Sequence, residues 1–182
     1  MSKQALILID IQNDYFPGGK WPLDGVEAAA DNAARLLAAA RERGDLVVHV
    51  RHEFAGADAP FFAPGSPGAE IHPKVAPAAG EPVVLKHQVN SFRDTNLKQV
   101  LDQHSIATLT IAGSMSHMCI DAAARAAADF GYEVKVAHDA CATLALDFSG
   151  RQVAARDVHG SAMAALAFAY ANVAGTDELL KG

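Results

Sequence analysis

Cysteine is scarce in this sequence, and long apolar runs are missing from it. The two cysteines, Cys119 and Cys141, show no paired-cysteine spacing, so a disulfide framework is excluded and a reducing compartment is favoured. The first apolar run, Ala5–Ile9, is five residues long and ends at Asp10. Such a run is too short for a signal peptide or a membrane span. We therefore expect a cytoplasmic protein that has no membrane partner.

An excess of positive charge is also missing. Fifteen lysines and arginines stand against 21 aspartates and glutamates, which gives a formal net charge of −6 and argues against a nucleic-acid partner. Hydrophobic residues make up 51% of the chain and charged residues 20%, a balance typical of a compact globule. No internal repeat or low-complexity tract is present. A length of 182 residues then predicts one domain, residues 1–182.

Short apolar runs alternate with alanine-rich stretches along the chain. The runs predict strands over Ala5–Ile9, Leu46–Val50, Pro82–Leu85, Ala107–Ile111, Glu133–Ala137 and Asn172–Ala174. The other stretches predict helices over Val26–Arg43, Asn96–Gln103, Met118–Phe130, Gly150–Tyr170 and a short tail from Thr176. Strands this apolar, separated by helices, indicate an α/β fold with a parallel sheet covered on both faces. Such sheets bind ligands at the carboxyl ends of their strands.

One segment, Phe54–Gly80, breaks the alternation of strands and helices. It carries five of the eight prolines and the pair Phe61-Phe62. Long irregular segments inside a compact domain are usually functional or disordered. Its aromatic residues favour an ordered loop over the site of its own or a neighbouring subunit.

Polar side chains follow three of the predicted strands at the point where each strand ends. Asp10 directly follows the first strand and Lys86 the third. Cys119 lies between the fourth strand and the next helix, where the helix N-terminus favours a thiolate. The three residues would supply a base, a cation and a nucleophile at one sheet edge. Taken singly, each has an ordinary alternative: a capping carboxylate, a solvated lysine and a buried structural cysteine.

Several motifs in this order resemble those of the isochorismatase-like cysteine hydrolases. They are Ile9–Phe16, Lys86 with Ser91-Phe92, Gly113–Asp121, Gly131–Val134 followed by Asp139-Ala140, and His159. The resemblance covers nearly the whole chain. It implies a three-layer α/β/α Rossmann-like fold with a six-stranded parallel sheet.

The resemblance also implies roles for individual residues. Asp10 would be the general base, Lys86 the charged third member and Cys119 the nucleophile. A cis peptide is expected at Ser114–Met115, and the backbone N–H groups of Met115 and Cys119 would form an oxyanion hole. The implied reaction is hydrolysis of a small amide, ureido or carbamoyl compound through a Cys119 thioester.

Three other functions remain open at this level. An isochorismatase proper cleaves a vinyl ether without a nucleophilic cysteine, so Cys119 argues against it. A nicotinamidase carries a metal on an Asp-x-His pair and a further histidine, whereas this chain has His49, His52 and His72 without that pair. A non-catalytic relative would not need Asp10, Lys86 and Cys119 together. We therefore expect an enzyme with no metal and no other cofactor.

Aromatic residues in the motif loops are candidates for the substrate pocket, with core packing as the alternative for each. Phe16, Trp21, Phe92 and His117 are the predicted substrate-binding residues, and His117 also has a structural alternative. Phe54, Phe61 and Phe62 are further wall candidates, and the last two could equally form a subunit contact. Cys141 is expected in the core. The expected partners are a small amide-like substrate and further copies of the chain, in a homodimer or homotetramer.

Overall fold

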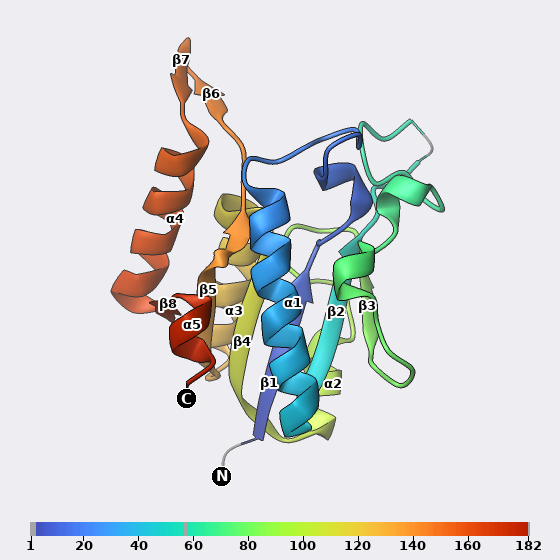
Figure 1. Cartoon of the computed structure of the whole chain (residues 1–182), viewed down its shortest axis with the longest axis vertical. Coiled ribbons are helices and arrows are strands. Elements are labelled where there is room, and N and C mark those ends of the chain that lie inside the picture. Colours follow the sequence, from blue (N-terminus) through green and yellow to red (C-terminus); the bar gives the residue numbers. More distant parts are fainter. Residues whose placement is uncertain (1–2, 57, 182) are drawn as a thin grey trace.

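A six-stranded parallel sheet runs through the middle of the computed structural model, in the strand order β3-β2-β1-β4-β5-β8 (Figure 1). The structure describes residues 3–56 and 58–181, so residues 1, 2, 57 and 182 of the predicted domain lie outside it. All six predicted strands are present. They are β1 (Lys3–Ile9), β2 (Leu46–His52), β3 (Val83–Lys86), β4 (Ile106–Ser114), β5 (Glu133–Ala142) and β8 (Asn172–Ala174).

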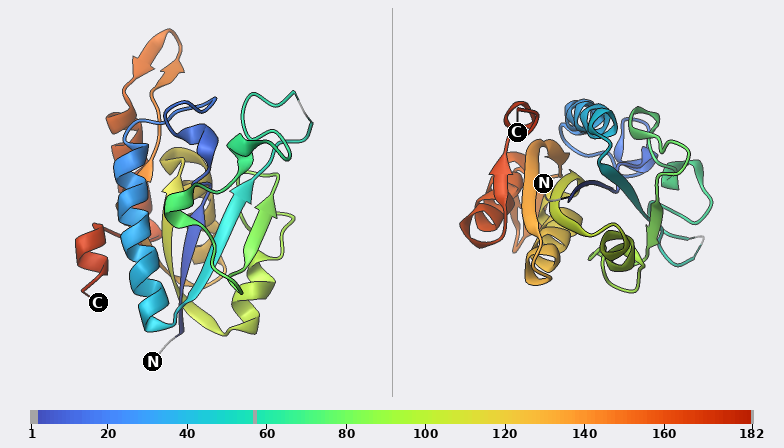
Figure 2. Two further views of the ribbon diagram at one scale, coloured as in Figure 1. Left: turned by 45° about the vertical axis from the view of Figure 1, so that its right-hand side comes forward. Right: turned by 90° about the horizontal axis from the view of Figure 1, so that it is seen from below.

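Helices cover both faces of this sheet, as the view from below makes clear (Figure 2). On one face lie α1 (Val26–Arg43) and α5 (Thr176–Leu179), and on the other lie α2 (Leu97–Gln103), α3 (Asp121–Asp129) and α4 (Ala155–Ala169). The three-layer α/β/α fold predicted from the sequence is therefore confirmed. None of the helices in residues 3–56 and 58–181 is long and apolar enough to cross a membrane.

The apolar strands are buried from both sides because their side chains alternate between the two layers. In β1, Leu6 and Leu8 pack in the core beside α1, while Ile7 and Ile9 pack in the core beside α2, α3 and α4. This is why β1 is apolar without interruption. Its central place in the sheet puts the residue that follows it, Asp10, between the ends of β2 and β4.

The last helix was predicted over Gly150–Tyr170, but its start is wrong, because α4 begins at Ala155. Residues before Ala155 form an antiparallel hairpin of β6 (Leu146–Phe148) and β7 (Arg151–Val153), which projects from the body at the top of Figure 1. The turn residues Ser149 and Gly150 both have positive φ, 51° and 76°. Two consecutive positive φ angles suit a tight hairpin turn and exclude a right-handed helix there.

Gly113 of β4 sits where no side chain fits. A Cβ atom built there would lie 1.9 Å from the carbonyl oxygen of Ile9, and its φ of 129° is one that side-chain-bearing residues rarely adopt. We expect Gly113→Ala to lower the free energy of unfolding by about 3 kcal/mol or more, because strands β1 and β4 must separate. Urea denaturation measures this loss.

Gly160 in α4 provides the matched control. A Cβ built at Gly160 meets no atom within 4 Å. Gly160→Ala should therefore raise the free energy of unfolding by about 0.5–1 kcal/mol through better helix propensity. Similar denaturation midpoints for the two variants would contradict the close approach of β4 to β1.

Candidate active site

The carboxyl ends of the central strands bring Asp10, Lys86 and Cys119 together. The Nζ atom of Lys86 lies 2.8 Å from Oδ2 of Asp10, 3.3 Å from Sγ of Cys119 and 3.1 Å from Nδ1 of His52. An ammonium has three N–H donors. Lys86 therefore forms hydrogen bonds with His52 and Cys119 and an ion pair with Asp10, and the geometry expected for the three sequence-predicted residues is present.

Burial controls the charges of this cluster. Asp10 and Lys86 have no exposed surface. Burial raises the pKa of the Asp10 carboxyl, while the charge of Lys86 opposes the rise. Burial alone would lower the pKa of Lys86, but Asp10 and Cys119 outweigh it and the pKa is raised, so Lys86 stays cationic. The backbone of Asp10 is also held in the left-handed region, with a φ of 52°, as happens at functional sites.

The pKa of the Cys119 thiol is shifted upward, in the opposite direction from the shift expected at a helix N-terminus. Burial and the nearby Asp10 raise its pKa, and Lys86 only partly offsets them. The local backbone also differs from the expected helix start. Residues Ser116–Ile120 form a π-helical turn and α3 begins at Asp121, so Cys119 lies inside a wide turn, not at the first residue of an α-helix.

The raised pKa predicts the pH dependence of thiol alkylation. Below the pKa of a thiol, its thiolate fraction grows about tenfold per pH unit. The rate at which iodoacetamide labels Cys119 should therefore climb from pH 7 through pH 9 without a plateau. Peptide mapping by mass spectrometry measures it at each pH.

Cys141 is the internal control for that measurement. It is buried, its thiol donates to the Ala137 carbonyl at 3.3 Å, and burial raises its pKa to about 12. It should stay unlabelled while Cys119 reacts. A plateau of the Cys119 rate near pH 7 would show that the thiol pKa is depressed and would contradict the site as described.

The turn before Cys119 is held from behind by hydrogen bonds. The Ser114–Met115 peptide is cis, as the resemblance implied. The hydroxyl of Ser116 lies 2.8 Å from Nδ1 of His159 and 3.3 Å from the carbonyl oxygen of Ala142. His159, one of the residues on which the resemblance rested, therefore supports the nucleophile turn from α4 and does not face the Cys119 thiol directly.

The first motif loop fixes the end of β2. The buried side chain of Gln12 donates to the carbonyl of His52 and to that of Ala69, and accepts from the N–H of His52, each at 2.8 Å. Through these bonds Gln12 joins β2 to the Phe54–Gly80 loop. His52 is thus placed against Lys86, a contact that the sequence reading missed because it weighed His52 only as a metal ligand.

A cavity of about 350 Å³ opens beside Cys119 and is called the Cys119 cavity below. It is lined by Asp10, Tyr15, His52, Phe54, Phe61, His87, Gln88, Val89, Met115, Met118 and Cys119. Two of the wall candidates, Phe54 and Phe61, come from the long loop, which therefore borders the site of its own chain. Phe62 is fully buried behind them.

The four predicted substrate-binding residues lie outside this lining. Phe16 stacks on His72 with ring centroids 3.7 Å apart, and Trp21 stacks on Phe61 at 4.9 Å. Phe92 packs against Phe130 at 5.3 Å. The Nδ1 atom of His117 lies 2.7 Å from the hydroxyl oxygen of Thr143, and His117 borders a different groove, between α3, α4 and the hairpin.

One physical reason explains why all four residues lie outside the lining. Membership of a motif loop fixes position along the chain, but the direction of a side chain is set by packing. Tyr15, next to Phe16, points into the cavity in its place, and the residues after Lys86, His87 to Val89, do so in place of Phe92. The position of His87 to Val89 directly after a strand end was the signal available in the sequence.

The histidines of the predicted metal region have other contacts. His49 bonds Glu81 at 2.9 Å and His52 contacts Lys86, while His72 stacks on Phe16. Among the described residues, no group of three or more His, Cys, Asp or Glu side chains is placed to hold a metal ion.

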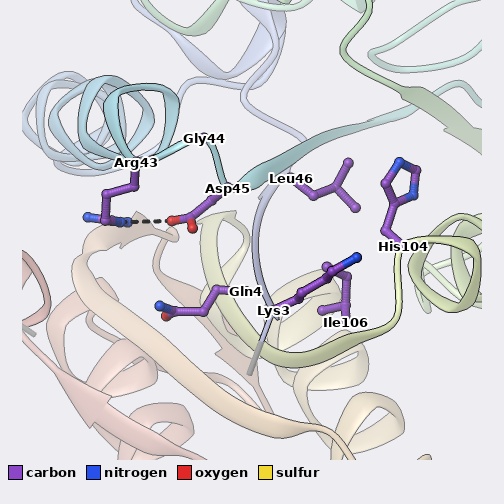
Figure 3. Close-up of a pocket in the computed structure, with 8 residues that line it drawn as sticks. All are labelled: Lys3, Gln4, Arg43, Gly44, Asp45, Leu46, His104 and Ile106. Carbon is purple, nitrogen blue, oxygen red and sulfur yellow. Dashed lines mark hydrogen bonds and ion pairs between the residues drawn. The ribbon is translucent and has the colours of Figure 1, made fainter. Parts of the chain in front are cut away.

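A larger cavity, of about 600 Å³, lies at the opposite edge of the sheet (Figure 3). It is lined by Lys3, Gln4, Arg43, Gly44, Asp45, Leu46, His104 and Ile106. Arg43 and Asp45 pair with each other there at 2.8 Å. Because none of Asp10, Lys86 and Cys119 reaches this edge, the smaller cavity is the candidate active site.

Known proteins resemble this chain in sequence and in fold. A model of the isochorismatase domain matches residues 4–173. The isochorismatase family protein YddQ of Bacillus subtilis is 48% identical over 177 residues, 97% of this chain and 98% of that protein. The maleamate amidohydrolase of Pseudomonas putida is 34% identical over 154 residues, 75% of this chain and 71% of that protein. A crystal structure from Oleispira antarctica, of a protein assigned as an isochorismatase hydrolase, has a TM-score of 0.96 and 62% identity, covering 100% of this chain and 97% of that one. The chain therefore belongs to the isochorismatase family of hydrolases.

Proposed function

We propose that this chain is a cysteine hydrolase that cleaves the C–N bond of a small amide, ureido or carbamoyl compound. The observation that carries the proposal is the meeting of a carboxylate, an ammonium and a thiol at one cavity, with Lys86 Nζ within 3.3 Å of both Asp10 and Cys119. The amidohydrolase among the relatives supports the same bond type.

The first half of the reaction forms a thioester. Asp10 accepts the thiol proton as Sγ of Cys119 attacks the substrate carbonyl carbon. The oxyanion is stabilised by the backbone N–H groups of Met115 and Cys119, and such donors typically contribute about 3 kcal/mol each to lowering the barrier. The protonated Asp10 then gives its proton to the leaving nitrogen as the C–N bond breaks.

The second half restores the thiol. Asp10 takes a proton from water while the water oxygen attacks the thioester carbonyl. The C–S bond breaks, the acid leaves, and the proton held by Asp10 returns to Cys119. Lys86 remains cationic throughout and keeps the charges of Asp10 and Cys119 balanced, which suits its lack of exposed surface.

The experiment for this proposal is a panel of small amides, ureas and carbamoyl compounds assayed for ammonia release. Rapid acid quenching followed by mass spectrometry should reveal the acyl group on Cys119. Turnover without any acyl adduct on Cys119, together with turnover of a vinyl ether, would favour the isochorismatase-type reaction. If the chain catalyses neither reaction, the result would favour the alternative that it is a non-catalytic relative.

The same site predicts metal-independent activity. His49, His52 and His72 have separate partners, so their nitrogens do not converge on one ion. We expect full activity after exhaustive chelation, less than stoichiometric metal by elemental analysis, and poor turnover of nicotinamide relative to other small amides. One tightly bound zinc or iron per chain, with activity lost on its removal, would contradict this prediction and favour a nicotinamidase.

We also propose that the chain works in the cytoplasm as a homodimer or homotetramer. Two large apolar side chains support self-association, because Phe148 of the hairpin is 76% exposed and Phe168 of α4 is 92% exposed. Light scattering at several protein concentrations measures the assembly.

A further inference from the structure

The Cys119 cavity offers no guanidinium or free ammonium that could form an ion pair with a carboxylate on the substrate. Its described lining residues include no arginine and no lysine. The adjacent cation, Lys86, is fully buried and already has Asp10, His52 and Cys119 as acceptors. Its charge is therefore paired with Asp10 and two of its N–H donors are engaged before a substrate arrives.

His52 does not supply a positive charge either. Burial and the charge of Lys86 lower its pKa to about 4, so the imidazole is neutral at physiological pH. Its Nδ1 atom faces the ammonium of Lys86, which has no lone pair, and so Nδ1 must be the acceptor. His52 therefore acts as a neutral wall of the cavity.

Aromatic and apolar side chains make up most of the rest of the wall, beside the polar side chains of His87 and Gln88. Phe54 meets Phe61 edge-on with centroids 5.0 Å apart, and Tyr15 lies 5.6 Å from Phe61. Burial, Asp10 and Cys119 all raise the pKa of the Tyr15 phenol, which keeps it uncharged. An anion entering this cavity would lose its hydration and meet uncharged donors such as the Nε2–H group of His52 and the amide of Gln88, but no lysine or arginine, next to the carboxylate of Asp10.

We propose that the Cys119 cavity selects uncharged amides with a flat hydrocarbon group, which excludes nicotinamide because its ring contains a polar nitrogen, and rejects amides that carry a carboxylate. This inference rests on the proposed cysteine hydrolase function and narrows its substrate class. Aromatic faces stack well with flat apolar groups, and the cavity volume of about 350 Å³ suits a small molecule.

A pair of thiol reagents tests the selection without requiring turnover. Iodoacetamide and iodoacetate are similar in size and differ in charge. At pH 8, where ordinary imidazoles are neutral, their rates with Cys119 are each divided by their rates with 2-mercaptoethanol. We expect the normalised rate to favour iodoacetamide by at least about tenfold, as expected for an anion left unpaired near a buried carboxylate. Equal rates, or faster labelling by iodoacetate, would overturn the proposal.

Two arginine substitutions distinguish the effect of a charge in the cavity from the effect of the protein's net charge. Val89 lines the cavity and is 39% exposed, whereas Val153 lies on the hairpin and is 38% exposed. Val89→Arg should shift the ratio toward iodoacetate by about fivefold or more, since it brings a cation to the cavity. Val153→Arg should leave the ratio within about twofold, because screening weakens distant charges. Equal shifts in the two variants would assign the effect to net charge and refute the inference.

Matched substrates complete the test. Benzamide and 4-carbamoylbenzoate share the scissile amide and the ring, and we expect kcat/KM to favour benzamide by about a hundredfold, as for an unpaired buried charge. Hydrolysis of the carboxylate compound at an equal or higher rate would refute the charge selection while leaving the cysteine hydrolase intact. If no amide is turned over but iodoacetamide is still preferred, the proposed function fails and the charge selection of the cavity stands.

Discussion

Replacing Cys119 with alanine should abolish amide hydrolysis and leave the fold intact. The change removes the attacking sulfur and little volume, and Lys86 keeps two of its three acceptors, Asp10 and His52. Loss of a covalent nucleophile typically lowers kcat by about 10⁴-fold or more. Turnover is measured by ammonia release, and the fold by circular dichroism and urea denaturation.

Cys141→Ala is the control for this experiment, because it removes the other thiol of the chain. Cys141 lies in the core and bonds the Ala137 carbonyl, so its loss should cost about 1 kcal/mol of stability and leave turnover within about twofold. If Cys119→Ala kept even a tenth of the wild-type turnover, covalent catalysis at Cys119 would be ruled out.

Replacing Asp10 with asparagine should produce two opposite effects. Turnover should fall by about two orders of magnitude or more, because the amide cannot accept the thiol proton. The thiol should become more reactive, because Asp10 raises the pKa of Cys119 and Lys86 lowers it. With the carboxylate gone, burial still raises the thiol pKa, but the neighbouring charge that remains is that of Lys86, which lowers it, and iodoacetamide labelling at pH 7 should accelerate by about tenfold or more.

The pair of measurements distinguishes a proton acceptor from a residue that merely shapes the site. A damaged site would lose turnover and leave the labelling rate unchanged. Asp45→Asn is the matched control, since Asp45 pairs with Arg43 at the opposite edge of the sheet (Figure 3). It should leave both rates within about twofold. Retained turnover with weaker substrate affinity in Asp10→Asn would make Asp10 a binding residue and contradict the proton route.

Asp10→Asn also tests the energetics of the buried ion pair. Asp10 and Lys86 lie 2.8 Å apart without solvent contact. Removing one charge leaves the other uncompensated, which typically costs about 3–5 kcal/mol. The remaining contacts of Lys86 with His52 and Cys119 should hold the loss near the lower limit. Urea denaturation of the variant measures it.

Local sequence patterns were enough to predict the sheet and the residues that meet at its edge. Uninterrupted apolar runs such as Ala5–Ile9 belong to strands buried on both faces, and that pattern is local. A polar residue directly after such a run, like Asp10 or Lys86, must lie at the carboxyl edge of a parallel sheet. The family motifs then identified the cis peptide at Ser114–Met115, which periodicity alone does not reveal.

The hairpin was wrongly predicted as helix, because the helix propensity of the following alanine-rich stretch was given more weight than the turn residues. The alanine-rich stretch after Gly150 is helical from Ala155 on, but Arg151–Val153 pairs with Leu146–Phe148 across a turn of two positive φ angles. Ser149-Gly150 was the available turn signal. Pairing between neighbouring segments decided the conformation there.

The walls of the Cys119 cavity and the upward shift of its thiol pKa depend on how distant segments pack together. Tyr15, His52, Phe54 and Val89 come from separate segments, and packing turns each of them toward the cavity while turning Phe16 away. The thiol pKa depends on burial and on the distances to charges, and neither quantity is encoded in a helix start. Sequence order therefore determined which residues reach the sheet edge. Their packing determined which ones face the cavity and which charge they carry.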